Sequence, residues 1–368
     1  MPDADAFRPL DGLRVVELAA VLAGPTAGQF FAELGADVVK VEPPSGDVTR
    51  TWHLASEAPD DDRPAYFCAA NWGKRSVALD LRTDAGRAAL RDLLGTADVV
   101  VSAYKPGDAA RLGVDAEALR AARPGLIVAE LTGYGAADPR AGYDAVVQAE
   151  AGWMHLCGDA GGPPTKLPVA FVDLMAAHQI KEAVLAALLR RARTGQGATI
   201  RLSLVAAAVS ALANQGTNWL VGGVSPRRMG SAHPNIAPYG TPYATATGEV
   251  VLAVGTDAQF AALCRTLGLD LHADARFATN AARVRHRAAL DAALVPVLAA
   301  ADRAALLRAL AAAHVPAGAV ADVAGALAHP EAARLVLRGD GVAGLRQVAF
   351  TLDGAPPLAL APPPHRPG

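Results

Sequence analysis

Short apolar runs alternate with helix-like segments over the first third of this 368-residue chain, and this alternation restricts the possible folds most strongly. An apolar run at residues 13–18 is followed by a Gly-Pro break and by helical spacing over residues 26–34. Further predicted strands, and the predicted helices between them, lie at residues 38–41, 76–79, 98–102 and 126–131, and at residues 85–94 and 116–122. The pattern predicts an α/β fold with a mostly parallel sheet covered by helices on both faces.

Residues 222–242 are rich in Gly, Pro, Arg and Asn, and this change of composition divides the chain. Before it, the predicted elements are a long helix, a strand and a second helix, at residues 174–193, 198–202 and 205–221. After it, they are a hairpin, two helices and a last strand, at residues 242–254, 257–267, 283–313 and 349–352. The stretch itself is typical of a linker or a functional loop. We therefore predict a smaller α+β domain at residues 225–325.

The composition excludes several classes of protein. Hydrophobic residues make up 52% of the chain and charged residues 19%, which is typical of a globular protein. The net charge of −2 provides no overall field for nucleic acid or an anionic membrane. No apolar run is long enough to span a bilayer, and the first residues lack the features of a signal peptide, so a cytoplasmic location is expected.

The cysteines and histidines give no support to a metal site. The three cysteines, Cys68, Cys157 and Cys264, are far apart and form no CxxC pair. The nine histidines show no HxxxH or HxH spacing, and His155 and His178 are interpreted as structural. We therefore expect no metal and no metal-dependent mechanism.

Asp173 follows the apolar run at residues 168–172 and precedes the long predicted helix. One interpretation makes it the N-cap of that helix, because aspartate is among the preferred capping residues. The other makes it a reactive carboxylate, held ionised by the helix dipole and the free N–H groups and shielded from water that would hydrolyse an acyl intermediate. The two interpretations are compatible with each other.

A glycine-rich turn and several basic residues are further candidates. The run that starts at Gly133 has the spacing GxGxxD rather than the dinucleotide pattern GxGxxG, so a nicotinamide dehydrogenase is disfavoured. Residues 72–76 resemble the end of a phosphate loop, but Cys68 stands where the first glycine should be. Four basic residues near strand ends can neutralise phosphates or lie on the solvated surface: Lys74, Arg75, Lys105 and Arg111.

Taken together, the motifs resemble a known family, the class III CoA-transferases of the CaiB/BaiF type. This family includes formyl-CoA and carnitine-type CoA-transferases and also the α-methylacyl-CoA racemases. The resemblance covers most of the chain in order, through residues 10–17, 23–25, 34–43, 46–50, 71–76, 105–107, 131–135, 142–144, 173, 193–197 and 232–239.

The resemblance implies a fold and a subunit arrangement. The expected large domain is Rossmann-like, spans residues 1–224 and is completed by residues 326–368. Two subunits are expected to interlock as a homodimer. The implied substrates are an acyl-CoA and a small carboxylic acid, with CoA as a substrate rather than a tightly bound cofactor, and neither nucleic acid nor a membrane is an expected partner.

The resemblance also implies a mechanism and site residues. Asp173 would attack the acyl-CoA to give a mixed anhydride, the CoA thiolate would form an aspartyl-CoA thioester, and the acceptor would take the CoA through a second anhydride. Tyr143 and Asp144 are expected to line the acyl pocket. The expected CoA contacts are Leu22, Ala23, Ala70, Asn71, Trp72, Gly73, Lys74, Arg75, Ala103, Tyr104, Lys105, Arg111, Thr132 and Gly133.

Two alternatives to a transferase remain at this point. A racemase of the same family would need a histidine where this chain has Tyr143, and a phenol with a reference pKa near 10 is a poor base at neutral pH. A non-catalytic relative would use Asp173 only as a helix cap. Within the transferases, the glycine-rich flap of the formyl-CoA enzymes is replaced by Met229-Gly230-Ser231, which disfavours formate and oxalate as substrates.

Overall fold

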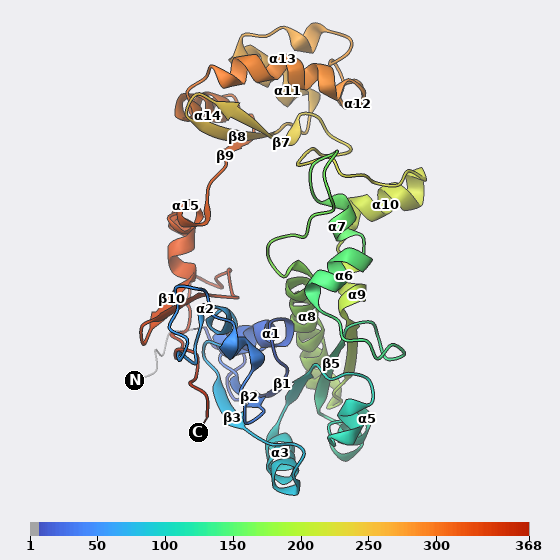
Figure 1. Cartoon of the computed structure of the whole chain (residues 1–368), viewed down its shortest axis with the longest axis vertical. Coiled ribbons are helices and arrows are strands. Elements are labelled where there is room, and N and C mark those ends of the chain that lie inside the picture. Colours follow the sequence, from blue (N-terminus) through green and yellow to red (C-terminus); the bar gives the residue numbers. More distant parts are fainter. Residues whose placement is uncertain (1–6, 368) are drawn as a thin grey trace. The chain divides into compact units, whose positions relative to one another are not determined.

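A six-stranded parallel sheet forms the centre of the larger of two compact units in the computed structural model, which describes residues 7–367 (Figure 1). The strand order is β3-β2-β1-β4-β5-β6, and every neighbouring pair is parallel. The strands are β1 (Arg14–Leu18), β2 (Asp37–Glu42), β3 (Arg75–Ala78), β4 (Val99–Ser102), β5 (Ile127–Thr132) and β6 (Thr199–Ser203). The predicted α/β class with a mostly parallel sheet is confirmed.

Helices cover both faces of this sheet because its strands are apolar on both sides. Val15 of β1 belongs to a core with α1 and α8, whereas its neighbour Val16 belongs to a second core with α3 and α5. Figure 1 shows α3 and α5 on one side of the strands and α1 and α8 on the other. The helices of this unit include α1 (Ala23–Glu33), α2 (Ala65–Cys68), α3 (Asp84–Thr96), α4 (Asp108–Arg111), α5 (Ala116–Ala122), α6 (Asp144–Glu150), α8 (Phe171–Thr194), α9 (Leu204–Ser210) and α10 (Ala213–Gly222), with a 3-10 turn, η1 (Val48–Thr51).

Two helices begin earlier than the sequence pattern predicts. Helix α1 includes the Gly24-Pro25 pair that was predicted to interrupt the chain, because a proline in the first helical turn sacrifices no hydrogen bond. Helix α8 begins at Phe171 rather than residue 174 and ends at Thr194, followed by Gly195, whose φ of 69° makes it a left-handed C-cap. The predicted helix 205–221 is divided into α9 and α10, since Ala213 has a φ of 47°.

The second unit comprises Met154–Thr165 and Val224–Pro330 and has its own apolar core. Its antiparallel sheet has the order β7-β8-β9, and the predicted hairpin is confirmed as β7 and β8. Its elements are β7 (Tyr239–Thr245), β8 (Gly248–Ala253), β9 (Ala317–Ala319), α11 (Asp257–Leu267), η2 (Leu271–Ala273), α12 (Asn280–Arg285), α13 (Arg287–Ala299), α14 (Arg303–Ala312) and α15 (Val323–Leu327). The single helix predicted over residues 283–313 is wrong: a cap at Asp302, which accepts a hydrogen bond from the Ala305 N–H, starts a separate helix.

The two units do not coincide with the predicted domains in every segment. Residues 154–165 pack with the second unit, although the predicted large domain includes them. Short elements lie at the unit boundaries, namely α7 (Trp153–Leu156) and η3 (Pro330–Leu335). The limits 1–224, 225–325 and 326–368 stay a prediction, and residues 1–6 and 368 within them lie outside the described residues. Among residues 7–367, no helix combines the length and apolar character needed to cross a membrane.

The C-terminal segment returns to the large unit and is attached to α1 by a buried carboxylate. It contains the hairpin of β10 (Val336–Gly339) and β11 (Val342–Leu345), whereas the strand predicted at residues 349–352 is absent. Glu33, which is 3% exposed, accepts hydrogen bonds from the backbone N–H groups of Gln347 at 2.7 Å and Val348 at 3.0 Å. Gln29 extends the contact by donating to the Glu33 carboxylate and to the Leu345 carbonyl.

We expect Glu33→Ala to lower the free energy of unfolding by about 2–3 kcal/mol, because two N–H groups would lose a charged acceptor in a buried setting. Limited proteolysis should then cut the C-terminal segment faster, and urea unfolding measures the loss of stability. Glu331→Ala is the control, because its carboxylate is exposed and pairs with Arg334 on the surface, and it should change stability by less than about 0.5 kcal/mol. Equal stability of the two variants would contradict the attachment.

Candidate active site

A cavity of about 240 Å³ opens at the carboxyl ends of β1, β4 and β5. The sheet order reverses between β1 and β4, and ligands of open α/β sheets bind at such a switch point. The lining comes from the loops that follow these three strands, and from the start of α8. Its residues are Ala20, Val21, Leu22, Ala23, Gly24, Ala103, Tyr104, Lys105, Pro106, Leu131, Thr132, Gly133, Arg140, Ala141, Gly142, Tyr143, Asp144, Asp173 and Leu204.

Asp173 lies in the first turn of α8 and lines this cavity, with 8% of its surface exposed. The prediction that it is the N-cap is wrong, because the helix begins two residues earlier and Ala170 occupies the cap position. Within the described part of the chain, no group donates a hydrogen bond to the Asp173 carboxylate. Burial, and secondarily the charge of Asp144, raises the pKa of Asp173 from its ordinary 3.8 to about 7.

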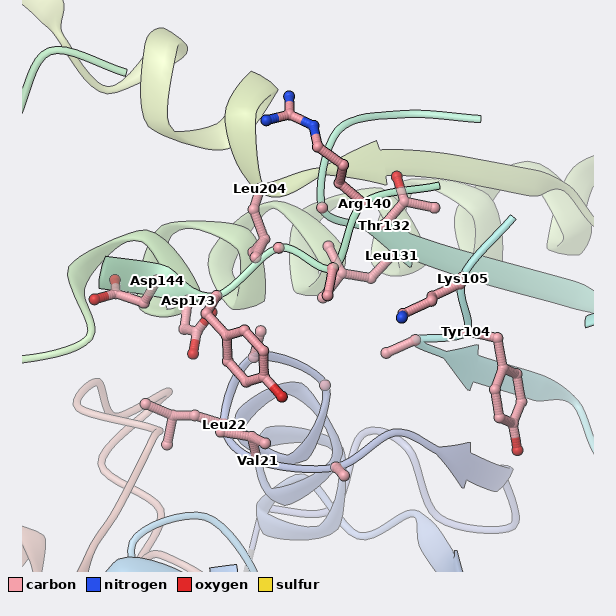
Figure 2. A pocket seen from close by; sticks show the side chains of 18 of the residues that line it. Val21, Leu22, Tyr104, Lys105, Leu131, Thr132, Arg140, Asp144, Asp173 and Leu204 are labelled. Carbon is pink, nitrogen blue, oxygen red and sulfur yellow. The ribbon is translucent and has the colours of Figure 1, made fainter. Parts of the chain in front are cut away.

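This result corrects the expectation that free helix N–H groups hold Asp173 ionised. The helix dipole lowers the pKa of a first-turn carboxylate by about 1.5 units at most, since it contributes about 0.3–2 kcal/mol. Burial next to a second carboxylate acts in the opposite direction and is stronger here. Figure 2 shows the Asp173 side chain directed toward the loop that carries Val21 and Leu22. The site therefore holds a carboxylate that is poorly stabilised as an anion and faces a cavity.

Asp144, the first residue of α6, supplies the cap that Asp173 was expected to provide. Its Oδ1 accepts a hydrogen bond of 2.8 Å from the backbone N–H of Val172, next to Asp173. Its Oδ2 accepts one of 2.7 Å from the Nε2 of Gln148, whose Oε1 in turn accepts the Leu167 N–H at 2.9 Å. The short helix α6 thus holds both the start of α8 and the chain that leads into it.

The opposite wall of the cavity is the loop between β1 and α1, which has a strained backbone. Val21 has a φ of 69°, which is unfavourable for a β-branched residue. Lys40 donates to the Ala19 carbonyl at 2.8 Å, and Lys74 donates to the Pro25 carbonyl at 2.9 Å, so the loop is held on both sides. Both ammonium groups also bind the buried carboxylate of Glu17, at 3.0 and 2.8 Å.

Glu17 and Lys40 are the positioning residues that the sequence analysis missed. Each is a charged residue inside an apolar strand, Val15–Leu18 in one case and Val38–Val41 in the other. Such a residue indicates a buried ion pair, because an unpaired charge is very costly to bury. This signal was present in the sequence, although it does not say which partner each charge has.

The predicted CoA contacts at residues 70–75 lie outside this cavity and the neighbouring one. Ala70, Asn71 and Trp72 are fully buried. Lys74 is directed into the core toward Glu17, and burial lowers its pKa to about 8. Arg75 starts β3 and pairs with Asp37 at the start of β2. This pair lies at the amino-terminal ends of the strands, whereas the cavity lies at their carboxyl ends. Gly73 lines a shallow hollow near the same amino-terminal ends.

A second cavity of about 390 Å³ continues from the first along the ends of β4, β5 and β6. The two share Tyr104, Lys105, Pro106, Leu131 and Thr132. Figure 2 shows the Lys105 ammonium directed into the cavity, and no carboxylate among the described residues pairs with it. The predicted residues Leu22, Ala23, Ala103 and Gly133 line the first cavity as well, whereas Arg111 lines neither and pairs with Asp108 on α4.

The chain matches CoA-transferase family III over residues 10–365. The succinate–glutarate CoA-transferase of Agrobacterium fabrum is 45% identical over 287 residues, which are 76% of this chain and 72% of the relative. The acetyl-CoA:oxalate CoA-transferase of Acetobacter aceti is 35% identical over 342 residues, which are 91% of this chain and 87% of the relative.

Solved structures agree with the sequence comparison. A CaiB/BaiF family protein from Brucella suis superimposes with a TM-score of 0.83 at 43% identity, covering 97% of this chain and 96% of that one. Family, fold and extent of the match therefore agree over nearly the whole chain. The chain belongs to CoA-transferase family III and is a class III CoA-transferase.

Proposed function

We propose that this enzyme moves CoA from an acyl-CoA donor to a carboxylic acid through covalent intermediates on Asp173. The observation that carries the proposal is the Asp173 carboxylate itself, which is buried, receives no hydrogen bond from the described residues and faces a cavity at the sheet's switch point. A carboxylate that is weakly solvated and weakly hydrogen-bonded is a better nucleophile than a capped one.

The proposed reaction conserves the thioester bond energy in four steps. An Asp173 oxygen attacks the acyl-CoA carbonyl, and CoA leaves as a thiolate to give a mixed anhydride. The thiolate then attacks the Asp173 carbonyl and releases the donor acid, leaving an aspartyl-CoA thioester. The acceptor carboxylate attacks that thioester and expels the CoA thiolate, which gives a second mixed anhydride. The thiolate then attacks the acceptor acyl carbonyl of this anhydride, which forms the acceptor acyl-CoA and releases the Asp173 carboxylate.

The lining of the cavity supports these steps by limiting water and by offering a place for CoA. Val21, Leu22 and Leu204 supply apolar surface near Asp173, which protects an anhydride from hydrolysis. CoA would extend through the second cavity, with Lys105 at the junction to neutralise phosphate charge. No residue of the 70–75 block is needed for this placement.

We further propose that the acceptor is a short dicarboxylic acid. The relatives in Agrobacterium fabrum and Acetobacter aceti are named for succinate, glutarate and oxalate. Lys105 lines the first cavity, has no carboxylate partner among the described residues and offers a counter-charge to a second carboxylate. Oxalate is the least favoured of these acids, because Met229-Gly230-Ser231 replaces the glycine-rich flap of formyl-CoA enzymes.

A homodimer remains part of the proposal. Helix α10 exposes three consecutive apolar residues, Trp219, Leu220 and Val221, which are 53%, 80% and 89% exposed. A contiguous apolar patch of this kind is typical of a protein interface. The patch lies near the C-terminal end of α10, which belongs to the large unit.

Acyl-CoA and hydroxylamine should convert Asp173 to a hydroxamate during turnover, because both the anhydride and the thioester react with amines. Peptide mass spectrometry detects the product. Asp173→Asn should show no labelling and at least about a thousandfold lower CoA exchange, since covalent capture is lost. Asp84→Asn, at a remote and exposed carboxylate, is the matched control and should behave like wild type. An unlabelled Asp173 in an active enzyme would refute the mechanism.

Asp173→Asn should also stabilise the folded protein at pH 8. The folded state holds a proton on Asp173 up to about pH 7, whereas the unfolded chain loses it near 3.8, so stability falls as the pH rises between these values. A pKa rise of this size corresponds to at most about 4 kcal/mol, and the helix dipole offsets up to about 2 kcal/mol. We expect a gain of about 2 kcal/mol at pH 8 and almost none at pH 4, measured by urea unfolding. A destabilised variant at pH 8 would contradict the burial argument.

An acceptor panel tests the substrate class. With succinyl-CoA as donor, glutarate should be used at least about tenfold more efficiently than oxalate or acetate, which corresponds to about 1.4 kcal/mol of discrimination. Mass spectrometry of the CoA products gives the ratio of kcat/KM values. Equal use of acetate and glutarate would remove the dicarboxylate proposal and leave Asp173 chemistry untouched.

A further inference from the structure

The start of α8 separates two tasks that one carboxylate usually performs. A first-turn or capping aspartate ordinarily accepts helix N–H groups and is stabilised as an anion. Here the Val172 N–H is directed to Asp144 at 2.8 Å, and Asp173 in the next position receives no hydrogen bond from the described residues. Both carboxylates line the same cavity. Asp144 therefore takes the bond that would otherwise be available to Asp173.

Asp144 is itself held in place by groups that are not part of the cavity. Gln148, one turn further along α6, is fully buried and donates to the Asp144 Oδ2 at 2.7 Å. The Gln148 Oε1 accepts the Leu167 N–H at 2.9 Å, which ties α6 to the chain before α8. Asp144 thus has both oxygens engaged and a fixed direction, which is unlike a side chain kept free to bind an acyl group.

We propose that Asp144 is a positioning residue, which caps α8 in place of Asp173 and presents a fixed negative charge against which the Asp173 carboxylate reacts. This inference rests on the proposed covalent function of Asp173. It assigns to Asp144 a role other than the substrate contact that the sequence analysis expected.

The charge of Asp144 favours the covalent states for an electrostatic reason. Free Asp173 carries a negative charge close to Asp144, whereas Asp173 in an anhydride or a thioester carries none. Repulsion between the two carboxylates therefore raises the energy of the free nucleophile and is relieved when the acyl–oxygen or carbonyl–sulfur bond forms. The same repulsion contributes to the raised pKa of Asp173. The cap bond and the charge act together, but different substitutions can separate them.

Other charged groups near Asp173 do not supply this effect. Tyr66 on α2 is close enough for Asp173 to raise its pKa after burial, but the phenol is neutral at the working pH. Lys105 and Arg140 line the cavity and carry the opposite charge, and the Arg140 guanidinium is paired with Asp138 and Glu150. His178 and Lys181 lie five and eight residues further along α8. Asp144 is the nearby carboxylate that α6 contributes.

The test measures the rate of aspartyl-CoA thioester formation in single turnovers of the full-length enzyme between pH 5 and 9, with quenching and mass spectrometry. Asp144→Asn keeps an oxygen for the Val172 N–H but removes the charge. We expect the midpoint of the pH profile to fall by about half to one pH unit, and the thioester fraction at steady state to fall about three- to tenfold. Circular dichroism at each pH confirms that the variant is folded.

Two further variants separate charge from structure. Gln148→Ala loosens the brace and keeps the Asp144 charge, so it should slow the reaction while leaving the midpoint within about 0.2 pH units of wild type. Asp144→Glu should restore the wild-type midpoint, whatever its rate. An unchanged midpoint in Asp144→Asn, or an equal shift in Gln148→Ala, would overturn the inference. Failure of wild type to form any thioester would instead refute the proposed function.

Discussion

The carboxylate of Glu17 in β1 is the interaction on which the arrangement of this site depends. It is completely buried and binds two ammonium groups, Lys40 from β2 and Lys74 from the chain before β3. The same ammonium groups donate to carbonyls at the two ends of the β1–α1 loop, so one buried charge cluster fixes the loop that faces Asp173. Removing one member of such a cluster leaves the others buried and unpaired, which commonly costs about 3–5 kcal/mol. Close packing reinforces it, because any side chain at Gly28 would collide with Glu17.

This rigid loop explains how an unfavourable backbone conformation is kept at the site. A left-handed φ at Val21 costs about 1–3 kcal/mol and persists only where neighbouring contacts determine it. The contacts near it are those of Lys40 in β2 and Lys74 before β3, and the loop lies where the order of the parallel sheet reverses. Lys74, which belongs to the block 70–75 that resembles a ligand-binding motif in the sequence, therefore helps to hold the wall of the cavity.

The sequence predicts the parallel sheet because the spacing of apolar residues and the positions of turn-forming residues are local properties of the chain. The runs around Val15, Val38 and Val99 are too apolar to face water, and those around Val15 and Val99 are followed by helical patterns. It also predicts that Asp173 is important, because an acidic residue between an apolar run and a helix is conspicuous. The direction of each side chain is not local, however. Lys74 and Arg75 are neighbours, yet one enters the core and the other pairs at the amino-terminal ends of the strands. Nor does the spacing reveal that Asp144 caps helix α8 by accepting the N–H of Val172, which lies 28 residues later in the chain.

The cap of α8 is supplied by Asp144 rather than by Asp173, and this links the stability of the protein to its reactivity. A helix whose N-terminal N–H groups were all satisfied by Asp173 would be more stable and would carry a weaker nucleophile. The bond from the Val172 N–H to Asp144 satisfies one N–H of the first turn. Asp173 stays buried, without a hydrogen bond from the described residues and with a pKa of about 7. The unfavourable energy is then concentrated on one carboxylate, and covalent attachment of an acyl or CoA group removes it. A capped helix and a reactive carboxylate can therefore occupy adjacent positions, because the cap comes from a different helix.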